Sequence, residues 1–117
     1  MNNEQLAALC ADWQRRLRLQ DWDVTVLMVP VGDMDSCSHC GNIKYYLNTR
    51  ESKITLLDPA HYCGLGKYDI EVTLVHELLH CHFAPFAARD GSSKDSAQEQ
   101  AIDAIAKALV GAVREVK

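Results

Sequence analysis

The first third of the chain shows two spacings of apolar residues. Between about residues 3 and 19, apolar side chains recur every three or four positions, which is the period of a helix with one buried face. This stripe consists of Leu6, Leu9, Cys10, Trp13 and Leu17. From 22 to 29 the period shortens to two, and Pro30 ends the run. The pattern therefore predicts an amphipathic helix over 3–19 followed by a strand over 22–29.

Two more strands are predicted in the middle of the chain. Alternating apolar residues indicate a strand over 43–48, and the polar residues at 48–51 suit a hairpin turn. A third strand then runs over 53–57, until Pro59 and the aspartate before it end the run.

Two further helices are predicted in the second half. One spans 69–84, with Asp69 as its N-cap and Pro85 at its end. The last spans 96–115, and its buried stripe is predicted to consist of Ile102, Ile105, Leu109, Val113 and Val116. The order α-β-β-β-α-α predicts a single α+β domain over 1–117 with a short mixed or antiparallel sheet.

Composition and charge narrow the classes of function. The 117 residues include 12 Lys and Arg and 16 Asp and Glu, which give a net charge of −4. A mildly acidic chain lacks the basic footprint of a general nucleic-acid binder. No run of 18 apolar residues and no basic leader followed by an apolar run is present, so neither a membrane span nor a signal peptide is expected. We therefore expect a cytoplasmic protein with reduced cysteines; no feature indicates its oligomeric state.

The strongest chemical signal is His76-Glu-Leu-Leu-His80, an H-E-x-x-H motif in an otherwise apolar helix. At about 100° per residue, side chains four positions apart differ by about 40°, so His76 and His80 project from one face and can share one Zn²⁺ ion. Glu77 lies close enough to accept a proton from a water bound to that ion. Burying these polar groups without partners would be costly, which favours a metal site.

A third protein ligand has to come from elsewhere in the chain, because no H-E-x-x-H-x-x-G-x-x-H continuation exists. Glu99 is the best candidate, on the border of the buried stripe of the last helix. Two alternatives remain open: Ser96 and Glu99 also form a capping box, and Asp95 lies one turn earlier on the same stripe. The solvent face of this helix is predicted to carry Asp103, Lys107 and Arg114.

Other histidines and cysteines have weaker signals. His82 lies about 200° around the helix from His80 and is interpreted as a packed histidine. Cys37 and Cys40 form half of a zinc-ribbon pattern, and loop thiols without metal are the simpler interpretation. A second zinc site there would need ligands drawn from His39, His61 and Cys63. Cys10 and Cys81 are expected to be small core residues.

These motifs together resemble the minimal zincin metallopeptidases of the gluzincin type, including the minigluzincins and the short metallopeptidases of phages and prophages. The resemblance rests on the Trp-containing strand start at 21–26, the strand at 53–57, the H-E-x-x-H helix at 76–80 and an acid on the following helix. It implies that His76, His80 and Glu99 bind zinc and that Glu77 is the catalytic base. It also implies a host-cytoplasmic location if the chain is phage-encoded. The oxyanion-stabilising residue is not apparent, and His61, Tyr62 and Tyr68 are candidates.

The expected function is that of a zinc-dependent metallopeptidase, a hydrolase acting on a peptide or protein substrate. The strand at 53–57 is expected to form the sheet edge above the cleft and to bind an extended substrate by strand addition. Two alternatives remain: a zinc-binding but non-catalytic phage or prophage interaction module, and hydrolysis of an amide that is not a peptide. No nucleic-acid or membrane partner is expected.

Overall fold

The computed structural model describes residues 1–34, 40–62, 64, 66–87 and 92–116. Over these ranges the order of elements is α1 (Asn3–Arg16), β1 (Asp23–Val29), η1 (Val31–Asp33), β2 (Gly41–Tyr46), β3 (Glu51–Leu57), η2 (Pro59–His61), α2 (Ile70–Phe83), η3 (Ala84–Phe86) and α3 (Ser93–Glu115). The predicted α+β class and the order α-β-β-β-α-α are confirmed. In the part of the chain described, no helix is long and apolar enough to cross a membrane.

The sheet is mixed, with the strand order β1-β3-β2. β1 pairs with β3 in parallel, and β2 pairs with β3 antiparallel through the hairpin. The expectation that 53–57 forms the sheet edge is therefore wrong, because both hydrogen-bonding sides of β3 are already used. The edges are β1 and β2, and on β1 the side chain of Asn3 accepts a hydrogen bond from the amide of Met28 (2.9 Å).

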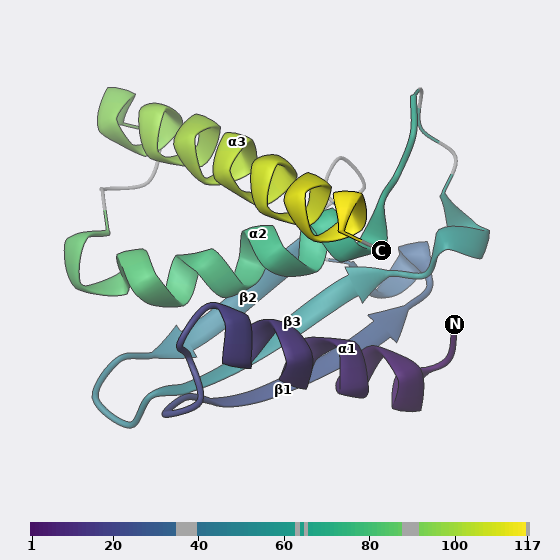
Figure 1. Ribbon diagram of the computed structural model, residues 1–117, viewed down its shortest axis with the longest axis horizontal. Coiled ribbons are helices and arrows are strands. Elements are labelled where there is room, and N and C mark those ends of the chain that lie inside the picture. Colours follow the sequence, from purple (N-terminus) through teal and green to yellow (C-terminus); the bar gives the residue numbers. More distant parts are fainter. Residues whose placement is uncertain (35–39, 63, 65, 88–91, 117) are drawn as a thin grey trace.

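The helices cover one face of this sheet (Figure 1). Along β3, Ser52, Ile54 and Leu56 are buried beneath α1 and α2, whereas Lys53, between them, points to the solvent. Trp13 of α1 and the apolar side of α2 belong to the same core cluster. α3 packs on α2, so α2 lies between the sheet and α3. This layering holds α2, which carries the H-E-x-x-H motif, from two sides.

The start of α2 agrees with the prediction, and the start of α3 does not. Asp69 caps α2 by accepting hydrogen bonds from the amides of Glu71 and Val72. α3 begins at Ser93, three residues earlier than predicted, because the Ser92 hydroxyl caps it by accepting from the Asp95 amide (3.0 Å).

The buried face of α3 is also rotated from the predicted one. Ile102, Ala106 and Val110 are buried, whereas the predicted core residues Ile105 and Val116 are 39% and 86% exposed. Ala106 packs where α3 meets α2, and a small side chain there allows the two helices to approach closely.

Arg114 does not simply face the solvent, as predicted, because it ties the end of α3 to the start of α2. Its guanidinium donates to both carboxylate oxygens of Asp69 (2.7 and 3.0 Å) and to Glu71 (3.0 Å). Glu71 in turn accepts from the indole N–H of the buried Trp13 (2.7 Å). These charge-assisted bonds join α1, α2 and α3 at one corner of the molecule.

Candidate metal centre

Three predicted ligands converge between α2 and α3. The Nε2 atom of His76 lies 2.9 Å from Glu99 Oε2, and the Nε2 atom of His80 lies 2.9 Å from Glu99 Oε1. The two imidazole rings project from one face of α2, with centroids 5.3 Å apart, as the i, i+4 spacing requires. One nitrogen or oxygen atom can be chosen from each of the three residues so that all three atoms lie within 4.8 Å of one another. Atoms this close together could bind a single metal ion.

The structure excludes one of the alternatives left open for Glu99, the capping box, and places the other, Asp95, in the same pocket. Ser96 is not the N-cap, so Glu99 lies in the second turn of α3 and cannot form the proposed capping box. Asp95 lines the same pocket, but the group of mutually close ligand atoms consists of His76, His80 and Glu99. Glu99 also lines up with the buried face of α3 and not with its border, which explains why its carboxylate reaches both histidines.

The chemistry of this donor set suits a transition metal such as Zn²⁺. Two imidazole nitrogens and one carboxylate make up the protein ligands of a common catalytic zinc arrangement, which leaves a coordination position open. Burial lowers the pKa of His80, an effect that the carboxylates of Glu99 and Asp95 oppose. A histidine that stays neutral is ready to bind a metal without first losing a proton.

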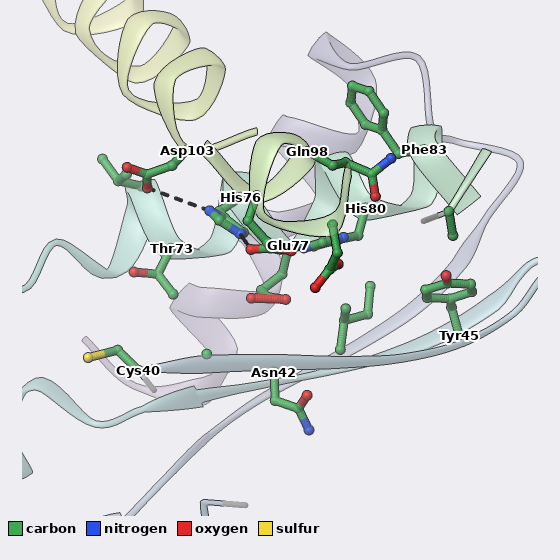
Figure 2. A pocket seen from close by; sticks show the side chains of 16 residues that line it. Cys40, Asn42, Tyr45, Thr73, His76, Glu77, His80, Phe83, Gln98 and Asp103 are labelled. Atoms are coloured by element: carbon green, nitrogen blue, oxygen red, sulfur yellow. Dashed lines mark hydrogen bonds and ion pairs between the residues drawn. The ribbon is translucent and has the colours of Figure 1, made fainter. Parts of the chain in front are cut away.

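Glu77 lies beside this group and is buried. Only 7% of the residue is exposed, and the side chain extends from α2 toward β2 (Figure 2). Burial raises the pKa of Glu77 from 4.5 to about 7; the charge of Glu99 adds to this effect and His76 opposes it. A carboxylate with a pKa near neutrality can both accept and return a proton under ordinary conditions.

Asp103 also belongs to the site, although it was predicted on the solvent face. Its Oδ1 atom lies 3.6 Å from Nδ1 of His76 (Figure 2), on the side of the ring opposite Glu99. The other carboxylate oxygen of Asp103, Oδ2, forms an ion pair with Nζ of Lys107 (2.8 Å). A carboxylate beside the second nitrogen of a ligand histidine orients the ring and makes it a better ligand. Its position four residues after Glu99, hence on the same helical face, could have revealed it.

The metal-ligand group opens into a pocket of about 680 Å³. β2 forms one wall, α2 and α3 form the others, and the end nearest Tyr45 and Phe83 is aromatic (Figure 2). The β2 residues that line it include Gly41, Ile43 and Tyr45. The candidate metal centre is therefore bordered by an edge strand of the sheet.

None of the three candidates for the oxyanion-stabilising residue lines this pocket. The Tyr68 hydroxyl donates to the carbonyl of Leu57 (2.6 Å), and Tyr62 packs against Tyr68 with ring centroids 5.4 Å apart. His61 is exposed on η2. Tyr45 is the tyrosine that faces the pocket, and its alternation with Ile43 along β2 is the sequence signal that places it there.

The remaining histidine and cysteine predictions have mixed outcomes. His82 is not among the metal-ligand group, but it is exposed and not packed, with its Nε2 beside the carbonyl oxygen of Leu17. Cys10 and Cys81 are buried, as predicted, and burial raises the pKa of each thiol to about 11, which keeps it unreactive. Cys37, His39 and Cys63 lie outside the described residues, so the proposed second zinc site stays a prediction; Cys40 lines the pocket.

Comparisons with known proteins do not extend this picture: no protein-family model, curated protein or solved structure matches the chain. The geometry of His76, Glu77, His80 and Glu99 is therefore the feature that points to a function. That geometry is a group of two histidines and one glutamate that could hold a metal ion, with a buried carboxylate beside it.

Proposed function

We propose that this protein is a zinc-dependent metallopeptidase of the minimal gluzincin type, acting in the cytoplasm. The observation that carries the proposal is the placement of Glu99 within 2.9 Å of both His76 and His80, with Glu77 buried beside them. A site that only stored a metal would need the three ligands alone. The buried Glu77 supplies what hydrolysis needs in addition, a base beside the reacting centre.

Each residue of the site has a separate role in the proposed reaction. His76, His80 and Glu99 would hold the zinc, which when bound acts as a Lewis acid that polarises a peptide carbonyl and makes water more acidic. Glu77 accepts the proton of the attacking water and then donates it to the departing amine, so the carboxylate ends the cycle as it began. Asp103 keeps the His76 ring oriented through Nδ1.

The outer edge of β2, which pairs with no other strand among the described residues, is the place where we expect the substrate to bind. The amide of Leu57 donates to the carbonyl of Cys40 (2.8 Å), and in an antiparallel ladder such bonded pairs alternate along the strands. Gly41, Ile43 and Tyr45 therefore direct their backbone N–H and C=O groups away from β3. The same residues line the pocket. An extended peptide added beside β2 would thus run along the metal centre.

Zinc binding and peptide hydrolysis, measured on the same samples, test the proposal. Purified protein should bind one zinc per chain in a chelator competition, and should cleave members of a quenched-peptide library only when zinc is present. Glu77→Gln should retain zinc and lose hydrolysis, because an amide cannot accept the proton. A protein that binds zinc but cleaves nothing, or a Glu77→Gln variant as active as the parent, would contradict the peptidase function and favour a non-catalytic module.

A further inference from the structure

Gly41, the first residue of β2, lies unusually close to α2. A Cβ atom at this position would be 2.6 Å from Cγ2 of Thr73, 3.2 Å from Cδ2 of Leu56 and 3.4 Å from Cγ of Glu77. Real Cβ atoms essentially never approach another heavy atom within 3.0 Å. Strand and helix therefore meet at a distance that only glycine allows, at the turn of α2 that carries Glu77.

The neighbours of Gly41 have little freedom to make room. Thr73 is β-branched, and its hydroxyl donates to the carbonyl of Asp69 (3.1 Å), so the position of its methyl group is held. Leu56 is completely buried in the core. A methyl group added at Gly41 would therefore displace the start of β2 away from α2. The situation differs at Gly32 and Gly111, where an added Cβ meets nothing within 4 Å.

We propose that Gly41 is a positioning residue that sets the distance between the substrate-binding edge of β2 and Glu77. This inference rests on the proposed function. Gly41 connects the two parts of the mechanism. Its backbone groups belong to the outer edge of β2, and a Cβ atom added to it would lie 3.4 Å from Cγ of Glu77. Because Gly41 has no side chain, β2 can lie close to α2, and this closeness sets the distance between a peptide bound to β2 and the candidate metal centre.

If Gly41 has this role, Gly41→Ala should lower kcat and leave KM nearly unchanged. A substrate paired with β2 moves together with the strand, so displacing the strand should leave KM within about threefold of the parent value. The scissile carbonyl would, however, move away from Glu77 and the ligands on α2 and α3. Because a misplacement of about 1 Å can cost about 100-fold in rate, we expect Gly41→Ala to lower kcat by roughly 10- to 100-fold. Zinc affinity should stay within about threefold, since the three atoms nearest to an added Cβ belong to Thr73, Leu56 and Glu77 and to none of the three candidate ligands.

A set of four variants tests this argument: Gly41→Ala, Thr73→Ser, the combination of both, and Gly111→Ala as a matched control. Thr73→Ser removes the methyl group that a side chain added at position 41 would meet, and it keeps the hydroxyl that bonds to Asp69. The double variant should therefore recover kcat to within a few fold of Thr73→Ser alone. Gly111→Ala adds the same methyl group on α3 without a contact and should keep the parent kcat and KM.

The possible outcomes separate this inference from the proposed function. A parent that cleaves peptides, together with a fully active Gly41→Ala variant, overturns the role of Gly41 alone. So does a double variant no better than Gly41→Ala, or a loss of zinc affinity in parallel with kcat. A single variant that fails to fold while the double variant folds and cleaves would support the same contact. A parent that binds zinc but cleaves nothing overturns the proposed function, and the role of Gly41 with it.

Discussion

Glu77 should make the metal-free protein less stable as the pH rises toward neutrality. Because its pKa is raised from 4.5 to about 7, the folded protein keeps a proton that the unfolded chain releases between these two values. The stabilisation from Glu77 is therefore complete below about pH 4.5 and is lost as the pH rises through about 7. Each pH unit in this window is worth about 1.4 kcal/mol, so the free energy of unfolding should fall by about 3 kcal/mol.

Glu77→Gln removes this loss, because an amide of the same shape does not ionise. Urea unfolding in the presence of a chelator should show Glu77→Gln gaining about 3 kcal/mol on the parent between pH 4.5 and pH 8. Glu4→Gln, which alters an exposed carboxylate on α1, should change stability by less than about 0.5 kcal/mol at either pH. A Glu77→Gln variant whose advantage does not grow with pH would refute the reasoning, and would mean that Glu77 is solvated in the folded protein.

Three further predictions concern the candidate ligands, the charged corner formed by Arg114, and a strained backbone position. Glu99→Gln should weaken zinc binding by at least about 100-fold in a chelator competition, whereas Asp95→Asn should stay within a few fold; the reverse result would place the ligand one turn earlier. Arg114→Gln should cost about 1 kcal/mol at pH 7 by urea unfolding. Because the hydrogen bonds from Arg114 lower the pKa of Asp69 below its ordinary 3.8, the difference should vanish as the pH falls through that lowered pKa. Arg18 has a φ of 61° at the end of α1, so Arg18→Gly should raise stability by about 1 kcal/mol in thermal unfolding, and a lower Tm would contradict that view.

The features that the sequence predicted correctly depend on local signals. The i, i+4 spacing of His76 and His80 and the capping role of Asp69 each involve residues within one or two helical turns, and the structure has both. Glu99 was harder, because its role depends on how two helices pack. The choice of Glu99 over Asp95 rested on its position beside the predicted buried stripe and on the resemblance to gluzincins, and the buried face of α3 is rotated from the predicted one. The hydrophobicity of Ile105 favoured it for the core, but Ala106 is buried in its place and Ile105 is 39% exposed.

The order of the strands could not be read from the alternation of residues. Parallel pairing of β1 with β3 joins residues that are 28 positions apart, such as Val26 and Ile54, and no local pattern reports it. The buried run of Leu56 and Leu57 at the end of β3 is the one hint that this strand is central. The same limitation hid the role of Gly41, since a glycine at a strand start has many explanations until the helix that lies against it is known.

The two edges of the sheet differ in their openness to self-association. The side chain of Asn3 accepts from an outward amide of β1. On β2, the outward groups of Gly41, Ile43 and Tyr45 pair with no strand among the described residues, so an extended chain could add there, including a second copy of this protein. Two copies paired antiparallel through β2 would bring the lysines at 44 and 53 of both molecules onto one face of a continuous sheet, where like charges repel. Dilute salt should therefore keep the molecules apart. Concentrated salt, which screens this repulsion, should promote pairing that covers the candidate metal centre.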